Sequence, residues 1–136
     1  MVPYSESSQI YPYLRYRNAR AAIDWLIDTF GFEPQMIVDG PDDTIAHAQL
    51  RLGDSVIMLG EVDDAAGERS PLDLPGVSGG LYAFVPDVDT HYERAKDGGA
   101  EIVRELATTD YGEAEYSARD LEGHHWSFGS YRPDGG

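Results

Sequence analysis

Residues 11–34, YPYLRYRNARAAIDWLIDTFGFEP, carry the pattern that decides the fold. The alternating aromatic and basic residues before Asn18 are typical of a strand, which we expect over residues 10–17. Asn18 is a good N-cap for a helix. Apolar residues then recur at helical spacing as far as Gly31, which predicts the end of that helix. The chain therefore opens with a strand followed by a helix.

The rest of the first half consists of three predicted strands, and the second half returns to the same order. In the first half these strands are residues 32–38, 44–52 and 55–59. Residues 61–79 are rich in Gly, Pro and Asp and have no sustained period, so they predict a connector. After the connector we expect a strand at 81–85, a helix capped by Asp87 or Asp89 and ending near Asp97, and strands at 100–104, 111–119 and 125–131.

Two segments of the second half match segments of the first at nearly one spacing. Residues 29–33 (TFGFE) match 97–101 (DGGAE) at an offset of 68, and 57–60 (IMLG) match 126–129 (WSFG) at an offset of 69. A repeat of this kind indicates two similar structural units. We therefore expect an α+β chain of two tandem βαβββ modules, residues 10–60 and 80–132, joined by a connector at 61–79.

Three segments resemble the glyoxalase / bleomycin-resistance / extradiol-dioxygenase superfamily, also called vicinal oxygen chelate. Residues 11–34 resemble its opening, and residues 47–60 (HAQLRLGDSVIMLG) and 111–131 (YGEAEYSARDLEGHHWSFGSY) resemble the ends of its two modules. The resemblance covers roughly residues 10–131. It implies paired βαβββ modules that form a mixed open sheet with a U-shaped cleft, helices on the outer face, and frequent homodimers.

The metal enzymes of this family place His or Glu ligands at four strand positions. The resemblance carries these positions to Tyr11, Met58, about Gly80 and Ser127. Zinc, iron and related ions prefer imidazole, carboxylate or thiolate donors at fixed distances, and these four residues do not supply them. The departure implies a branch of the family without the metal site, so we expect no metal and no other cofactor.

Alternation along the strands predicts which side chains face the cleft. We expect a ligand-binding face made of Tyr11, Tyr13, Arg15, His47, Gln49, Arg51, Met58, Tyr82, Phe84, Glu113, Glu115 and Ser127. Aromatic rings beside guanidinium groups suit a planar or anionic ligand, whereas the two glutamates suit a cationic one. His47 is the candidate general acid or base, because an imidazole titrates near neutral pH.

These residues also have simpler explanations. The tyrosines could fill the cleft or a dimer interface, the glutamates could lie on an exposed edge, and His47 could be a hydrogen-bonded strand histidine. Of the other histidines, His91 is expected on the solvated face of the second helix. His124 and His125 are expected to have turn and strand-start roles, and Trp126 is expected in the core.

The composition narrows the classes of function. With 25 acidic and 10 basic residues the formal charge is −15, which opposes binding to nucleic acid. No cysteine is present, so disulfides and thiolate chemistry are excluded. The chain has no apolar stretch of membrane-spanning length and no signal-peptide pattern at its start, so we expect a cytoplasmic protein without a membrane partner. Loops for phosphate, dinucleotide or serine-hydrolase chemistry are missing as well.

Three hypotheses remain open. The favoured one is a metal-independent binding protein for a natural product or antibiotic-like small molecule, similar to bleomycin-resistance proteins. The second is a glyoxalase-like lyase or isomerase that uses His47 with Arg15 or Arg51 instead of a metal. The third is a non-catalytic structural or regulatory dimer, so the sequence leaves open whether the protein is an enzyme.

Overall fold

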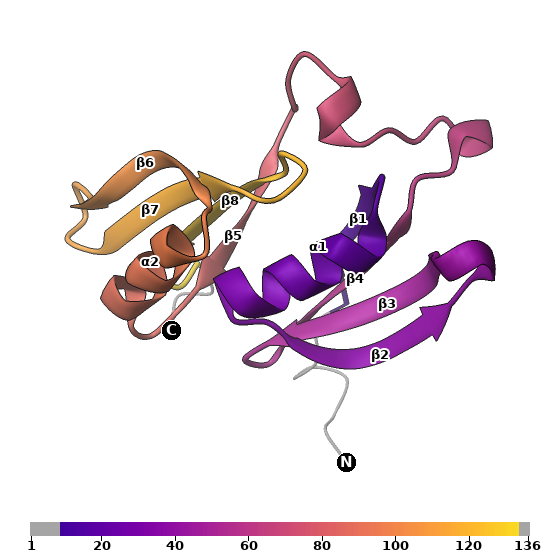
Figure 1. The fold of residues 1–136 in the computed structure, drawn as a ribbon. Coiled ribbons are helices and arrows are strands. Elements are labelled where there is room, and N and C mark those ends of the chain that lie inside the picture. Colours follow the sequence, from indigo (N-terminus) through magenta and orange to yellow (C-terminus); the bar gives the residue numbers. More distant parts are fainter. Residues whose placement is uncertain (1–8, 134–136) are drawn as a thin grey trace.

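The protein folds into two modules of similar architecture, seen side by side in Figure 1. The computed structural model describes residues 9–133 of the 136-residue chain. The first module contains β1 (Tyr13–Tyr16), α1 (Ala19–Trp25), η2 (Leu26–Phe30), β2 (Glu33–Asp39), η3 (Pro41–Asp43), β3 (Ile45–Leu52) and β4 (Ser55–Glu61). The second contains β5 (Gly80–Phe84), α2 (Val88–Asp97), β6 (Glu101–Thr108), β7 (Ala114–Arg119) and β8 (His125–Gly129). Two short 3-10 helices, η4 (Asp64–Ala66) and η5 (Pro71–Asp73), lie between them.

Each module has its own four-stranded mixed sheet. The strand order is β1-β4-β3-β2 in the first sheet, called sheet A below, and β5-β8-β7-β6 in the second, called sheet B. The pairs β1–β4 and β5–β8 are parallel and the other pairs are antiparallel. The prediction of an α+β chain with tandem βαβββ modules is therefore confirmed, with the strands divided between two sheets.

The predicted helix caps are present. The side chain of Asn18 accepts a hydrogen bond from the backbone N–H of Ala21 at 3.1 Å, and Gly31 ends the helical segment with a φ of 82°. In the second module Asp87 is the N-cap and accepts from Thr90, which decides between the two candidate aspartates. The first strand begins at Tyr13, later than predicted, because Pro12 has no N–H to donate to a ladder.

One face of each sheet is buried under helices and the opposite face is open. In β1, Leu14 and Tyr16 are buried while Tyr13 is 45% exposed, as the alternation of a strand requires. The helical layers meet between the modules: Phe30 of η2 packs against Trp126 and Phe128 of β8, with ring centroids 5.7 and 4.7 Å apart. A shared apolar core thus fixes the modules to each other.

A buried polar network also crosses the module boundary. The Asp120 carboxylate accepts hydrogen bonds from the Tyr16 hydroxyl at 2.6 Å and the Trp126 indole N–H at 3.0 Å. Burial, followed by the nearby Asp120 charge, raises the pKa of Tyr16 well above its usual range. Glu122, only 3% exposed, accepts from the Ser70 hydroxyl and from the backbone N–H groups of Arg17 and Asn18. The network ties the connector and the β7–β8 turn to the start of α1.

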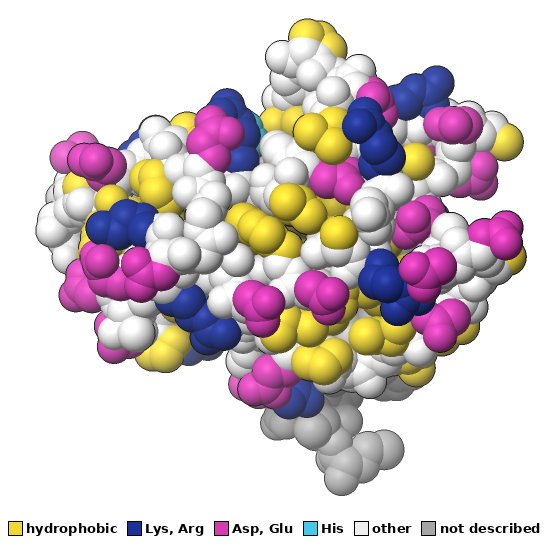
Figure 2. All heavy atoms as spheres, viewed as in Figure 1, with side chains coloured by type: hydrophobic (Ala, Val, Ile, Leu, Met, Phe, Trp, Pro, Cys, Tyr) yellow, Lys and Arg dark blue, Asp and Glu magenta, His cyan; other side chains and the backbone are white. Residues whose placement is uncertain are grey.

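The surface carries the acidic composition of the chain. Figure 2 shows Asp and Glu side chains spread over the visible face, with Lys and Arg and apolar groups between them. Within residues 9–133, no helix is long and apolar enough to cross a membrane.

Candidate functional site

The open face of sheet A presents a row of side chains, one from each strand. Tyr13 of β1 pairs with Met58 of β4, Met58 with Gln49 of β3, and Gln49 with Met36 of β2. Paired residues point to the same side of a sheet, so these four side chains form one continuous strip. Sequence reasoning identified Tyr13, Gln49 and Met58 but missed Met36, since β2 gave no reason to choose between its two faces.

A chain of hydrogen bonds orients His47 beside this strip. The side-chain amide of Gln35 donates to Oε1 of Gln49 at 3.0 Å. Nε2 of Gln49 in turn lies 3.1 Å from Nε2 of His47. An amide N–H must meet a lone pair, so this arrangement places the imidazole proton on Nδ1. The His47 ring also contacts Tyr13 edge-to-face, with centroids 6.3 Å apart. The Gln49 amide and the Tyr13 ring therefore fix the orientation of the His47 ring, with Nδ1–H as its donor.

Both candidate arginines of sheet A are engaged with carboxylates. The Arg15 guanidinium lies 4.2 Å from the centre of the Tyr13 ring, donates to Glu68 at 2.8 Å and bonds the Glu61 carbonyl oxygen. Arg51 pairs with Glu33 at 2.8 Å at the outer edge of the sheet. Arg15 thus extends the aromatic strip as a cation stacked on Tyr13, while Arg51 lies apart from it.

The open face of sheet B has the same geometry with different side chains. Tyr82 pairs with Ser127, and Ser127 pairs with Ser117, whose hydroxyl lies 2.7 Å from that of Ser127. Next to them Arg119 donates to Nε2 of His125 at 2.9 Å and pairs with Glu101 at 2.5 Å. The Arg119–Glu101 pair repeats the Arg51–Glu33 pair of sheet A, so the internal repeat extends to individual ion pairs.

Tyrosines and carboxylates gather at the end of sheet B where β7 begins and β8 ends. The Tyr82 hydroxyl donates to the Tyr131 carbonyl oxygen at 2.7 Å, and Tyr111 lies against Tyr131 with ring centroids 5.1 Å apart. Tyr111 also donates to Glu115 at 3.1 Å. Partial burial and then the charges of Glu115 and Glu113 raise the pKa of Tyr82. Exposed phenol rings beside carboxylates form an environment that attracts cations.

Tyr82, Tyr111 and Glu115 are called the tyrosine–glutamate cluster below, and the glycine at position 129 leaves room for it. A Cβ atom at Gly129 would lie 2.7 Å from the Tyr82 hydroxyl and 2.8 Å from the Ala114 carbonyl oxygen. The missing side chain lets Tyr82 lie across β8 toward β7.

The two expected glutamates lie in different places. Glu115 lies within β7, whereas Glu113 lies just before it and accepts a hydrogen bond from the Ser130 hydroxyl at 3.0 Å.

The four positions at which the family resemblance places metal ligands carry Tyr11, Met58, Gly80 and Ser127. Met58 offers a thioether, Gly80 offers no side chain, and the Ser127 hydroxyl is engaged with Ser117. Tyr11 precedes β1 and contributes a phenol. Among residues 9–133, no group of three His, Asp or Glu side chains is placed to hold a metal ion. The donor chemistry at these positions does not fit a hard divalent cation.

The expected ligand-binding face therefore falls into two groups. Sheet A brings together Tyr13, Arg15, His47, Gln49 and Met58, and sheet B brings Tyr82 near Glu115. Phe84 lies under the Arg132 guanidinium, 4.5 Å from its ring centre. Tyr111 and Tyr131 were not among the expected ligand-binding residues, because their strands were predicted three and two residues too long, which obscured their position at the sheet end.

The prediction for His91 was wrong. Its ring is half-buried between α2 and the rest of the core, with Nδ1 2.6 Å from the Tyr116 hydroxyl and Nε2 2.8 Å from the Phe30 carbonyl oxygen. A helix pattern shows which side is apolar, but it does not show that a neighbouring module covers the remaining side. Trp126 is in the core as predicted, at 2% exposure.

Comparison with known proteins gives one consistent result. The family described as Glyoxalase/Bleomycin resistance protein/Dioxygenase superfamily matches residues 9–128. The protein Mb0911c of Mycobacterium bovis is 34% identical over 121 residues, which cover 87% of this chain and 80% of that protein.

Two solved structures illustrate the range of the likeness. TioX from Micromonospora sp. ML1 is 33% identical, with a TM-score of 0.70 over 90% of this chain and 94% of that chain. The fosfomycin resistance protein FosX from Listeria monocytogenes, in a complex with Mn(II) and sulfate, is 15% identical, with a TM-score of 0.69 over 94% and 95% of the two chains. At that identity FosX shows the fold alone.

Proposed function

The chain belongs to the glyoxalase/bleomycin resistance protein/dioxygenase superfamily, and we propose that it is a metal-independent binding protein for an aromatic, cationic small molecule of the natural-product or antibiotic type. The observation that carries the proposal is the cluster of Tyr82, Tyr111 and Glu115 at the end of sheet B. Phenol rings bind a cationic aromatic group by stacking and cation–π attraction, and the carboxylate neutralises its charge.

The open face of sheet A supports the same kind of ligand. The strip formed by Tyr13, Met58, Gln49 and Met36 offers an aromatic ring, two adaptable thioethers and one amide. Such a surface binds an extended planar molecule by contact area, with few directional bonds. The metal-ligand positions of related enzymes carry Met58 and Ser127, so ligand recognition in this proposal uses side chains alone.

A binding test separates this proposal from metal-dependent chemistry. Protein stripped with a chelator is heated with proflavine, a planar aromatic cation, with acridine, its uncharged analogue at pH 7.5, or with single divalent metals. A ligand at about 100 times its dissociation constant adds roughly 2.7 kcal/mol of stability. We expect a rise in Tm with proflavine, a smaller rise with acridine, and none with metals.

Matched variants assign the effect to the cluster. Glu115→Gln keeps the shape of the side chain and removes its charge, whereas Glu105→Gln makes the same change on the exposed face of β6. We expect Glu115→Gln to reduce the proflavine shift and Glu105→Gln to leave it intact. A shift produced by a divalent metal, or equal shifts in both variants, would contradict the proposal.

A second candidate is a lyase or isomerase that uses His47. The hydrogen bond from Gln49 favours it, because it fixes the orientation and tautomer of the imidazole, as a general acid requires. Its weakness is that Arg15 and Arg51, the two groups expected to hold an oxyanion, are both paired with glutamates. If His47→Ala abolished turnover of an identified substrate but kept its binding, the enzyme would replace the binding protein.

We also propose that the protein is a cytoplasmic homodimer. Met36, Ile37 and Val38 on the edge strand β2 are 45–47% exposed, although they lie on alternating faces of the strand. An exposed apolar edge strand is prone to pair with another chain. Sedimentation equilibrium should give twice the chain mass, and Ile37→Lys should shift the equilibrium toward the monomer. A monomer at all concentrations would refute the dimer, and a dimer that binds no ligand would favour the structural role.

A further inference from the structure

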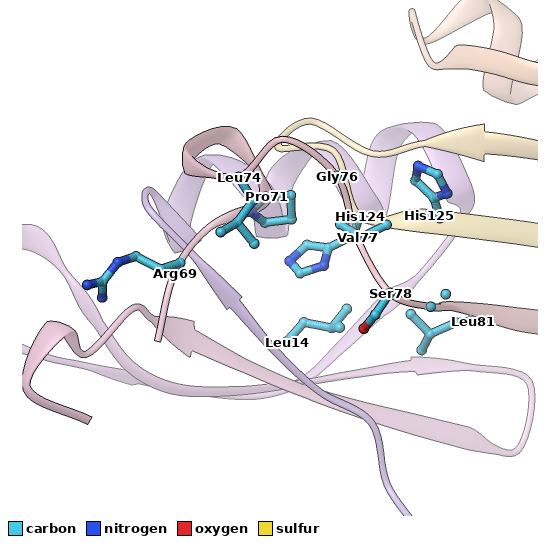
Figure 3. Close-up of a pocket in the computed structure, with 12 residues that line it drawn as sticks. Leu14, Arg69, Pro71, Leu74, Gly76, Val77, Ser78, Leu81, His124 and His125 are labelled. Atoms are coloured by element: carbon cyan, nitrogen blue, oxygen red, sulfur yellow. The ribbon is translucent and has the colours of Figure 1, made fainter. Parts of the chain in front are cut away.

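A hollow, called the connector pocket below, lies where the connector crosses the boundary between the modules. It has a volume of about 570 Å³, within the usual range for small-molecule sites. Figure 3 shows the residues that line it. They come from β1, the connector, the start of β5, the turn before β8 and the first residue of β8: Leu14, Arg69, Pro71, Leu74, Gly76, Val77, Ser78, Gly79, Gly80, Leu81, His124 and His125.

Both walls of this connector pocket are fixed by buried contacts. On the connector side, Ser70 is fully buried, donates to Glu122 at 2.6 Å and caps η5 by accepting from the Leu72 N–H. On the opposite side, the backbone N–H of His124 donates to Asp120, and its ring lies 4.8 Å from that of Tyr16. A pocket with ordered walls loses little conformational entropy when a ligand enters.

His124 supplies the directional group of the pocket. Its Nε2 lies 2.9 Å from the Arg15 carbonyl oxygen, and since a carbonyl can only accept, Nε2 carries the proton. In the neutral ring Nδ1 is then a lone-pair acceptor, and no hydrogen bond to it is formed by residues 9–133. Figure 3 shows the imidazole between Pro71 and Leu14. An unpaired acceptor on the wall of a pocket favours a ligand that brings a donor.

The charges of the lining residues restrict the ligand further. None of the twelve residues is acidic, although 25 of the 136 residues of the chain are Asp or Glu. Arg69 is already engaged with Asp64 at 3.4 Å and with the Glu68 carbonyl oxygen at 2.7 Å, and it extends away from the other lining residues in Figure 3. The pocket therefore lacks a counter-ion for a cation and a free cation for an anion.

We propose that the connector pocket binds an uncharged aromatic alcohol, whose ring lies among Leu14, Pro71, Val77 and Leu81 and whose hydroxyl donates to Nδ1 of His124. This ligand differs in charge from the one proposed for the sheet faces. The two sites are also separate, since the pocket shares no residue with the tyrosine–glutamate cluster or with the strip on sheet A.

The test compares 1-naphthol with 1-methoxynaphthalene, which has nearly the same shape but no donor. By equilibrium dialysis with the full chain, we expect 1-naphthol to bind roughly three- to tenfold more tightly, the range that one net hydrogen bond provides. His124→Phe keeps a ring against Tyr16 and should bring the ratio close to one. Leu121→Ala, an exposed change in the same turn outside the pocket, should keep the wild-type ratio.

The position of the bound ligand gives an independent readout. In methyl-labelled protein, intermolecular NOEs from 1-naphthol should reach Leu14 and Val77 and should not reach Met58 on sheet A. His47→Ala, which changes the sheet face, should leave naphthol binding unchanged. Absence of binding up to the solubility limit, an unchanged ratio in His124→Phe, or NOEs confined to the sheet faces would each overturn the proposal. Affinity that falls as protein concentration rises would also overturn it, because a second copy would then fill the pocket.

Discussion

The hydroxyl oxygen of Tyr116 lies 2.6 Å from Nδ1 of His91, while Nε2 of the same ring lies 2.8 Å from the carbonyl oxygen of Phe30. Because that carbonyl accepts the Nε2 proton, the neutral imidazole takes its other hydrogen bond from Tyr116. One histidine thus links α2, β7 and η2. Burial lowers the pKa of His91 and raises that of Tyr116, so both groups are held in their uncharged forms.

Acid should weaken the fold through His91. Its folded-state pKa lies below the ordinary value of 6.5, so the unfolded chain takes up this proton first as the pH falls. The stability that His91 contributes is present above that value and is lost as the pH drops toward the lowered pKa. Urea unfolding from about pH 7.5 to about pH 5.5 should show a smaller decline in His91→Gln than in wild type. His47→Gln should decline like wild type, and equal declines in all three proteins would contradict the assignment.

Removing the Asp120 carboxylate should be among the most damaging single changes. It would leave the Tyr16 hydroxyl, the Trp126 indole N–H and the backbone N–H groups of Glu122 and His124 without their side-chain acceptor. We expect Asp120→Ala to lower the free energy of unfolding by about 3–5 kcal/mol, measured in urea. Asp120→Asn keeps one acceptor oxygen and should lose less. Asp54→Ala, on an exposed turn, should change stability by no more than about 0.5 kcal/mol.

Gly129 and Gly76 should respond differently to the same added methyl group. At Gly129 a Cβ would meet the Tyr82 hydroxyl and the Ala114 carbonyl oxygen below 3.0 Å, whereas at Gly76 it would meet nothing within 4 Å. We expect Gly129→Ala to lose about 1–3 kcal/mol and to displace Tyr82, and Gly76→Ala to be nearly neutral. Thermal unfolding gives the first quantity, and the Tyr82 ring resonances report the second. Equal stabilities would show that the sheet can relax around position 129.

Arg94 should couple the helical layers of the two modules. From α2 it donates to the backbone carbonyl oxygens of Ile27 and Asp28 within η2, at 3.0 and 3.1 Å. We expect Arg94→Met to lower the free energy of unfolding by about 1–2 kcal/mol and to speed hydrogen exchange in η2. Lys96→Met removes an exposed pair with Glu93 within α2 and should leave exchange in η2 unchanged. Faster exchange in both variants would mean that α2 itself was disturbed.

Local patterns in the sequence determined much of the fold. Asn18 and Gly31 predicted both ends of the first helix, because a capping side chain and a left-handed glycine act through neighbouring backbone atoms. The alternation through His47, Gln49 and Arg51 predicted that they share one face of β3. The repeat at offsets of 68 and 69 residues predicted two modules. Each of these features depends on residues close together in the chain or on the comparison of one segment with another.

Tertiary structure decided which side chains meet across the module boundary. His91 looked solvated on its own helix, yet η2 of the other module covers it. Asp120 and Glu122 looked like ordinary turn residues, yet they accept hydrogen bonds from Tyr16 and Ser70, which are 104 and 52 residues away in sequence. The connector pocket exists only because residues 69–81 cross beside Leu14 and His124. Such contacts depend on how two packed units are oriented, and a periodic pattern within one element contains no information about that orientation.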